Sequence, residues 1–300
     1  YAQVENVQVA HPVYIFLQRA EAIGLLEHRS LSSLPLQKME IQECLRQINN
    51  KREHLTNSDL KLLEKNLLEF EIEKRENAVL FRSPSDSAFV LSDDLFSSKE
   101  KYFYYYSYDS TKVAVSPLGM LDNMFSLQDN EKSIIGTLGV RFSGSIDNRL
   151  GFYLQATNGR LFSGSRELAS QDKYYAKSIK FTKLNDDIDF SESHVNYRNR
   201  WFFASLARET KLEGAGLQQR IFIADIAPAF DALTLAAKFS NFEYTFIHGS
   251  LIGEPTQSSI GAFAEIPPKY MAYHKIAVRP SWGEIAFVEQ VIYSNRNTDL

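Results

Sequence analysis

Apolar and polar residues alternate along the later part of the chain, and this period of two constrains the fold more than any other feature. The clearest stretch runs from 137 to 157, where Leu, Val and Phe alternate with Thr, Ser, Gln and Arg around a turn at Asp147 and Asn148. This pattern is typical of an antiparallel hairpin with one apolar and one polar face. It also predicts strands at 112–117, 190–197, 200–208, 217–225, 231–239, 242–250, 269–279 and 283–293. We therefore expect a mainly β region of about ten strands and no helix within it.

The first part of the chain follows a different pattern. Only Gly24 of the 14 glycines precedes residue 119. Apolar residues recur at helical spacing in 11–24, in about 35–49 and in a third segment with Asn57 or Ser58 as its N-cap. We expect a helical bundle over 1–76, a linker and aromatic segment over 77–111, and antiparallel strands over 112–300. The bundle's apolar stripes are interpreted as core packing.

The spacing of the predicted strands favours a membrane β-barrel over a water-soluble sandwich. Short turns alternate with long connections at 159–189 and 253–268, as in a barrel with one tight end and one elaborated end. Each predicted strand carries about four apolar residues on one face, and in a tilted barrel strand this length is close to the thickness of the bilayer core. No window of 18 apolar residues predicts a membrane helix. The chain starts at Tyr1 rather than Met, which indicates either that a leader has been removed or that the sequence has been trimmed; a removed leader would mean export, and with a barrel we expect the cell outer membrane.

Charge and motifs exclude several classes of function. The 33 basic and 37 acidic residues give a net charge of −4 without a basic block, so nucleic acid is not expected as a partner. Cys44 is the single cysteine, and no His-Glu-x-x-His motif occurs, so we expect no metal or cofactor. The acidic run at 186–189 is interpreted as solvated rather than as a Ca²⁺ or glycosidase site. Residues 162–166 resemble a nucleophile elbow only superficially, because no helix is predicted after them.

Glycan binding has more support than catalysis. Arg141, Arg149 and Arg200 are expected to point inward or to lie at strand ends, where they contact an acidic polysaccharide or pair with Glu243 and Glu289. The alternative, which we favour, is that these charges pair with one another inside the barrel. Trp201, Trp282 and the tyrosines between Tyr102 and Tyr108 are candidates for stacking on sugar rings or for anchoring at a membrane interface.

A resemblance to a known family extends over most of the chain. The stretch His11–Leu25, followed by Leu34-Pro35-Leu36 and the helix to Ile48, resembles the N-terminal helical segment of Wzi-type capsule assembly proteins. Blocks similar to those of the family follow in the same order: Val115-Ser116-Pro117, 136–158, 214–216, 227–231, 244–249, 269–275 and 289–293. Position 275 departs from the family, because it is Lys where the family has Arg after a His.

The resemblance implies an outer-membrane β-barrel, with the helical bundle over 1–76 on its periplasmic side, that organises capsular polysaccharide at the cell surface without catalysis. It adds His248, His274 and Lys275 to the candidate glycan or lumen residues, beside Glu289. A barrel of this family has about eighteen strands, so we interpret the chain as the N-terminal part of a longer protein or as a shortened relative. Its partners are then surface polysaccharide and outer-membrane lipid, and the barrel is expected to be monomeric. A passive porin and a soluble β-rich carbohydrate-binding or hydrolytic protein are the alternatives.

Overall fold

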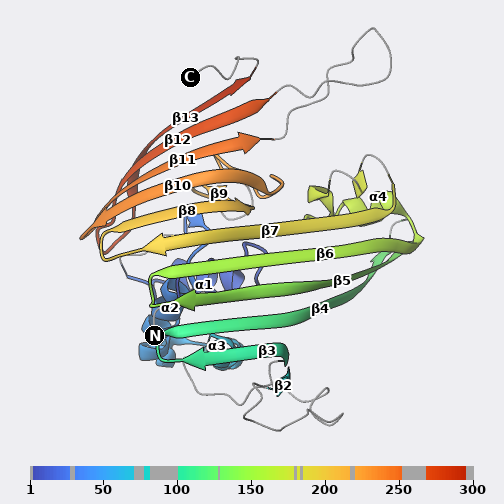
Figure 1. The fold of residues 1–300 in the computed structure, drawn as a ribbon, viewed down its shortest axis with the longest axis horizontal. Coiled ribbons are helices and arrows are strands. Elements are labelled where there is room, and N and C mark those ends of the chain that lie inside the picture. Colours follow the sequence, from blue (N-terminus) through green and yellow to red (C-terminus); the bar gives the residue numbers. More distant parts are fainter. Residues whose placement is uncertain are drawn as a thin grey trace.

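A large antiparallel sheet dominates the computed structural model, with a small helical layer on one of its faces (Figure 1). The structure describes residues 3–27, 31–70, 78–81, 101–127, 129–178, 181–182, 185–216, 220–251 and 268–294. The mainly β class is therefore confirmed. No helix within these ranges combines the length and apolarity needed to cross a membrane.

Three helices form the N-terminal layer where the sequence predicts them. They are α1 Val13–Ala22, α2 Lys38–Asn50 and α3 Asn57–Glu69. Their apolar stripes meet in one buried cluster that includes Phe16, Ile41, Leu45 and Leu63, so the core-packing interpretation holds. The N-cap of α3 is Thr56 rather than Asn57 or Ser58, because the Thr56 hydroxyl accepts a hydrogen bond from the Asp59 N–H.

Ten strands make up the antiparallel sheet. They are β3 Lys101–Tyr108, β4 Thr111–Ser126, β5 Glu131–Ile146, β6 Leu150–Gly164, β7 Asp187–Arg198, β8 Phe202–Glu209, β10 Phe230–Phe239, β11 Phe242–Leu251, β12 Lys269–Val278 and β13 Ile285–Ser294. Each pairs with its neighbours along the chain, and β2 Ala78–Phe81 adds to β3 in parallel. A separate pair joins β1 Ser33–Leu34 to β9 Leu212–Glu213. Within the described ranges β2 and β13 are the two edges, so the sheet is open there and closure into a barrel is not shown.

The connections differ between the two ends of the sheet. At one end, which we call the tight-turn end, β3–β4, β5–β6, β7–β8 and β10–β11 are joined by two or three residues each. Asp147, Asn148 and Ser240 have positive φ in these turns, a conformation that Asn and Asp tolerate comparatively well. The other end carries the long connections, including α4 Arg166–Ser170. Figure 1 shows the helical layer behind the sheet at the tight-turn end.

Some sequence predictions differ from the structure. A strand predicted at 217–225 is wrong for the described residues 220–225, where Ile223 forms only an isolated bridge with Glu213. This apolar stretch is instead a loop whose Ile223 packs into a buried cluster with Phe230 and Ile247. The aromatic segment expected to link bundle and strands contributes β3 to the sheet. The expectation of no helix after residue 112 is also wrong, since α4 follows β6.

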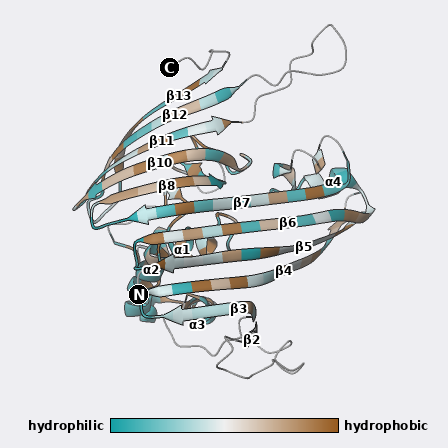
Figure 2. Ribbon diagram, viewed as in Figure 1, coloured by the Kyte–Doolittle hydropathy of each residue, from teal (hydrophilic) through white to brown (hydrophobic). Residues whose placement is uncertain are grey.

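The two faces of the sheet have opposite character. Hydrophobic and hydrophilic residues alternate along β4 to β7 in Figure 2. On the face that we call the outer face, Leu138 is 74% exposed and Leu206 is 69% exposed. On the inner face, which the N-terminal region covers, Asn196 is 0% exposed and Lys275 is 3% exposed. Apolar side chains therefore face outward, whereas the inner face is mixed and carries buried polar residues beside the apolar clusters around Ile135 and Ile247.

Candidate functional site

The N-terminal residues 3–8 lie against the inner face through a buried polar cluster centred on Asn6. The Asn6 N–H donates to Nε2 of His194 at 2.9 Å, and its side-chain amide donates to the Glu209 carboxylate at 3.0 Å. Asn196 in turn donates to Oδ1 of Asn6 at 2.9 Å. Lys211 Nζ lies 2.6 Å from Oε1 of Glu209, so the buried carboxylate is paired. These bonds fix the first residues of the chain to β7 and β8.

A glycine makes this close approach possible. A Cβ at Gly151 in β6 would lie 2.6 Å from the backbone N of Glu5 and 2.6 Å from the backbone C of Val4. Any side chain at 151 would therefore push the N-terminal segment away from the sheet.

A second buried cluster holds residues 32–33 against β12. Nζ of Lys275 donates to both Ser32 and Ser33 at 3.0 Å and lies 2.9 Å from Oε1 of Glu284. Arg279 bridges Glu284 at 2.7 Å and Glu243 at 2.6 Å. Burial raises the pKa of the Glu284 carboxyl, but Lys275, Ser32 and Arg279 outweigh it and hold the pKa below its usual range. The Glu284 carboxylate is therefore ionised at neutral pH, and together with Glu243 it balances the charges of Lys275 and Arg279.

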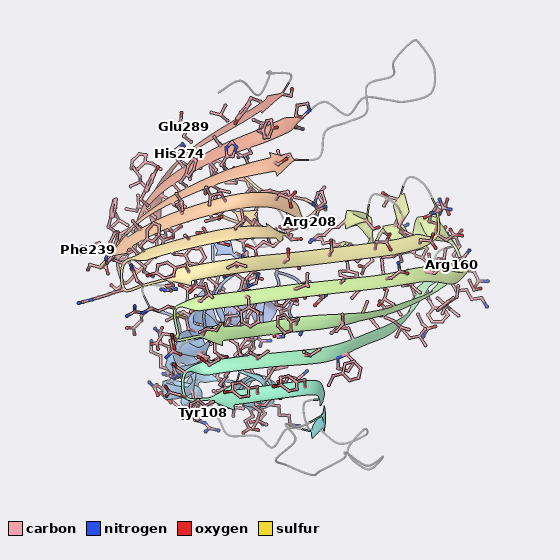
Figure 3. All side chains as sticks on the ribbon, viewed as in Figure 1. Tyr108, Arg160, Arg208, Phe239, His274 and Glu289 are labelled. Carbon is pink, nitrogen blue, oxygen red and sulfur yellow. The ribbon has the colours of Figure 1, made fainter. Side chains whose placement is uncertain are left out.

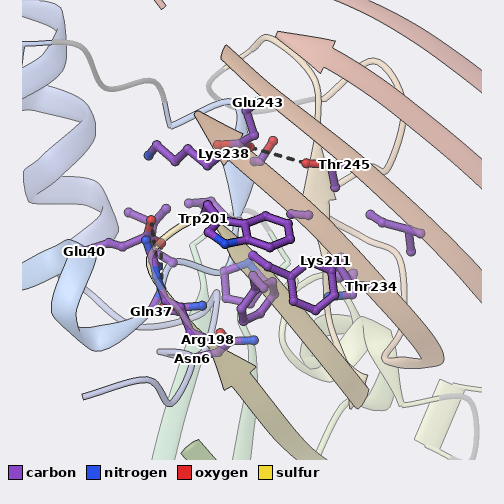
Figure 4. A pocket seen from close by; sticks show the side chains of 18 of the residues that line it. Asn6, Gln37, Glu40, Arg198, Trp201, Lys211, Thr234, Lys238, Glu243 and Thr245 are labelled. Atoms are coloured by element: carbon purple, nitrogen blue, oxygen red, sulfur yellow. Dashed lines mark hydrogen bonds and ion pairs between the residues drawn. The ribbon is translucent and has the colours of Figure 1, made fainter. Parts of the chain in front are cut away.

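A cavity of about 140 Å³ lies between the two clusters at the tight-turn end (Figure 4). Its walls come from residues 33–37, from the β7–β8 turn and from the inner faces of β8, β10 and β11. The polar and aromatic lining includes Asn6, Gln37, Glu40, Arg198, Arg200, Trp201, Phe202, Phe203, Lys211, Glu213, Thr234, Lys238, Glu243, Thr245 and Arg279. We call it the turn cavity.

Most charges of the turn cavity are matched within the wall. Arg198 lies 3.4 Å from Glu40, Lys211 pairs with Glu209, and Arg279 pairs with Glu243. The Thr245 hydroxyl donates to the Glu243 carboxylate at 3.4 Å, and Figure 4 shows Lys238 on the same side of the cavity. Arg200 has no carboxylate partner among the described residues.

Three arginines are predicted to point inward or to lie at strand ends. Of these, only Arg200 lines the turn cavity. Arg141 points inward, but its Nε donates to Gln155 at 3.0 Å and its guanidinium lies over the Tyr153 ring. Arg149 is exposed in the β5–β6 turn. None of them pairs with Glu243 or Glu289 in the described structure, so the expected pairing is wrong, while contact with an acidic polysaccharide stays a prediction. The favoured alternative is also wrong for these arginines, because the interior is filled by ion pairs of other residues.

The two histidines and Glu289 lie on the outer face instead of in the lumen. His274 and Glu289 are opposite each other in the β12–β13 register, and Figure 3 places them on these neighbouring strands. His274 contacts Tyr244, with Nδ1 2.8 Å from the tyrosine oxygen, and His248 stacks on Tyr270 at 6.0 Å. The lumen role predicted for these three residues is therefore wrong. Successive side chains of a strand point to opposite faces, and because Lys275 points inward, its neighbour His274 points outward.

The two tryptophans lie at the tight-turn end. Trp201 lines the turn cavity and is 57% exposed, with its ring 5.8 Å from that of Phe202. Trp282 lies in the β12–β13 connection and is 75% exposed. Only Trp201 therefore takes part in the candidate site.

The carboxylates and the elbow-like motif have structural partners. Asp186 pairs with Arg166 at 2.9 Å, Asp187 with Arg160 at 3.9 Å, and Asp189 accepts from Asn158 at 2.6 Å. The expectation that no helix follows residues 162–166 is wrong, because Ser165 is the N-cap of α4 and accepts a hydrogen bond from the Leu168 N–H. Its hydroxyl therefore caps a helix.

Sequence reasoning missed the residues that organise the interior. Asn6, His194, Glu209, Lys211 and Glu284 form the two buried clusters, yet no sequence motif singles them out. The sequence of β7 does contain a signal for the buried clusters, because the polar residues His194 and Asn196 occupy alternate positions on either side of Val195. Polar residues at inward parity of a barrel strand indicate interior partners.

Acid should weaken the Lys275–Glu284 cluster. The folded-state pKa of Glu284 is below its usual value of 4.5, so its contribution to stability is present above that value and is lost as pH falls through the lowered pKa. We expect Glu284→Gln to lower the free energy of unfolding at about pH 6 and to have a smaller effect at about pH 3, which lies below the usual pKa of the carboxyl. Urea unfolding followed by tryptophan fluorescence measures both; an equal effect at the two pH values would contradict this role.

Comparison with family models, with curated proteins and with solved structures finds no match to this chain.

Proposed function

We propose that the protein is an outer-membrane protein whose sheet is part of the lipid-facing wall of a β-barrel, and that it organises capsular or other surface polysaccharide without catalysis. The observation that carries the membrane assignment is the exposure of apolar side chains over one face of the sheet while polar and charged side chains are buried on the other. A water-soluble sheet buries its apolar face and wets its polar face. Here Phe287 is 77% exposed on the outer face while Lys275 and Asn196 are buried on the inner face, as in a barrel surrounded by lipid.

The apolar outer residues form a band with a defined border. Counted from the tight turns, this band ends on β8 and β10 at Arg208 and Asp231, which are opposite in register and lie 3.2 Å apart. On β11 the band ends at His248, two residues nearer the tight turns than the partner of Asp231. On β12 the first polar residue of the outer face is His274, again two residues nearer, and on β13 it is Glu289 opposite His274, with the exposed Val291 beyond it.

The border continues in the same direction on the other side of β8. On β6 the band ends at Asn158, whose register partner on β7 is Asp189. On β7 it ends at Ser193, four residues nearer the tight turns and opposite Arg208. From β6 to β13 the border thus moves about 26 Å along the strand direction, while the distance across these strands, perpendicular to them, is about 29 Å. Its slope of roughly 40° matches the tilt of strands in a membrane barrel.

Aromatic side chains mark the opposite border of the band. Trp201, Phe239, Trp282 and Tyr108 are exposed at the tight-turn end, and Figure 3 shows Tyr108 and Phe239 there, with Arg160 at the far end. Such rings gather at the interface between hydrocarbon and water. Short turns face the periplasm in bacterial barrels, so the tight-turn end and the helical layer are assigned to the periplasmic side.

The polysaccharide role is supported by the resemblance to Wzi-type proteins and by the covered inner face. Residues 3–8 and 32–33 are hydrogen-bonded to the inner faces of β7 and β12, which favours a filled interior over the open lumen of a porin. A filled interior leaves the ends of the wall as the surfaces where a polysaccharide makes contact.

Three measurements test the proposal. The protein is expected to require detergent for extraction and to float with lipid vesicles; a protein that stays soluble as a monomer without detergent contradicts the membrane assignment. In planar bilayers it should show no steady conductance, whereas open channels would favour a porin. Deletion of the full-length gene should release polysaccharide into the medium, and unchanged cell-bound polysaccharide would contradict the capsule role.

A further inference from the structure

The inner face beneath the turn cavity carries a row of polar side chains with unused oxygens. Thr234 lines the cavity, Ser205 is opposite it in the β8–β10 register, and Asn196 is opposite Ser205 in the β7–β8 register. The hydroxyls of Thr234 and Ser205 and Oδ1 of Asn196 are buried without a hydrogen-bond partner in the described structure. Buried oxygens of this kind are normally paired, so the cavity that Thr234 lines is suited to water or to a ligand rich in hydroxyl groups.

The charge of the cavity wall indicates an anionic ligand. Arg198, Lys211 and Arg279 each have a carboxylate within 3.4 Å or less. Arg200 lines the same cavity on the exposed β7–β8 turn, and no carboxylate of the described residues pairs with it. A guanidinium in this position presents two parallel N–H groups to a carboxylate.

Trp201 adds an apolar platform next to that cation. It follows Arg200 directly, lines the cavity and keeps 57% of its surface exposed. The flat ring of an indole offers an apolar surface to the C–H groups of a sugar, while hydroxyl groups of the sugar find partners at the wall. The volume of about 140 Å³ is suited to one sugar ring rather than to a chain.

We propose that the turn cavity binds one carboxylated sugar unit, a hexuronic acid of an acidic polysaccharide. Arg200 pairs with the carboxylate, Trp201 stacks on the ring, and the Thr234 hydroxyl bonds to a ring hydroxyl. This inference rests on the proposed function, because it places the sugar unit at the periplasmic end of the proposed barrel. It deepens that function, because it commits the glycan to an acidic one.

The two tryptophans of the chain allow a direct test. In Trp282→Phe the fluorescence reports on Trp201 alone. Detergent-solubilised Trp282→Phe protein is titrated with trigalacturonate, with neutral maltotriose and with inorganic phosphate. We expect a saturable change with trigalacturonate and none with the other two. A response to maltotriose of equal strength, a response to phosphate alone, or no response to trigalacturonate would overturn the proposal.

Matched variants separate this site from general charge attraction. Arg200→Gln is expected to weaken trigalacturonate binding at least tenfold, and Thr234→Val several-fold. Arg149→Gln removes an exposed turn arginine that does not line the cavity and should leave the affinity unchanged. Equal losses in Arg200→Gln and Arg149→Gln would also overturn the proposal. Vesicle flotation of Trp282→Phe is measured in parallel, so that a failure of the membrane assignment is distinguished from a failure of the sugar site.

Discussion

Leu154→Lys is expected to destabilise the protein in a lipid bilayer by about 2–4 kcal/mol. Leu154 lies within the apolar band on β6 and is 51% exposed on the outer face. In a membrane barrel a lysine at this depth replaces lipid contact by a buried charge. In a water-soluble sheet the same exposed position would tolerate lysine within about 0.5 kcal/mol.

Asn158→Lys is the matched control, on the same strand and the same face. Asn158 is exposed at the border of the band, and its register partner is Asp189, whose carboxylate is within reach of a lysine. We expect a loss of at most about 1 kcal/mol, because charges near the interface cost little. Reversible urea unfolding from phosphatidylcholine vesicles measures both variants. Equal effects of the two lysines would contradict the assignment of the outer face to lipid.

Lys275→Met should lower the free energy of unfolding by about 3 kcal/mol, because it removes one partner of a buried ion pair. Lys275 is 3% exposed and holds Ser32, Ser33 and Glu284 together. Glu284 keeps Arg279 as a partner, which places the loss at the lower end of the range for buried pairs. Detachment of residues 32–33 should also speed protease cleavage near them.

Lys269→Met provides the comparison on the same strand. Lys269 is partly exposed at the start of β12, and no ion pair to a described residue holds it. Its loss should change stability by no more than about 0.5 kcal/mol. Similar losses in the two variants would show that the Lys275 cluster does not hold the N-terminal segment.

Strand positions can be predicted wherever the alternation of residue types is strict. The stretch 137–157 alternates cleanly, and β5 and β6 form the predicted hairpin there. In β3 the residues from Tyr102 to Tyr106 are all aromatic, so period two is hidden, and the run fits a strand and a membrane interface equally well. At 221–223 the run Ile-Phe-Ile has strand propensity, yet local propensity yields here to packing of the loop on a buried cluster.

The candidate site can be predicted only in part. Charged and aromatic residues at a strand end suggest contact with a glycan, and on this ground Arg200 and Trp201 are predicted; both line the turn cavity. The lumen assignment of His274 fails on strand parity, because its neighbour Lys275 is the residue that points inward. The partners Asn6 and Glu209 are 203 residues apart, a separation at which no local pattern predicts contact.

The order in which the strands pair has a consequence for assembly. Within the antiparallel sheet each strand contacts its neighbours along the chain, and the four pairs joined at the tight-turn end close over short loops at a low entropic cost. The N-terminal segment contacts the sheet through residues far away in the sequence, such as Asn6 with His194 at a separation of 188. Its partners exist on one surface only after β7, β8 and β12 have paired. We therefore expect residues 3–8 to dock last, after the strands that they contact have paired.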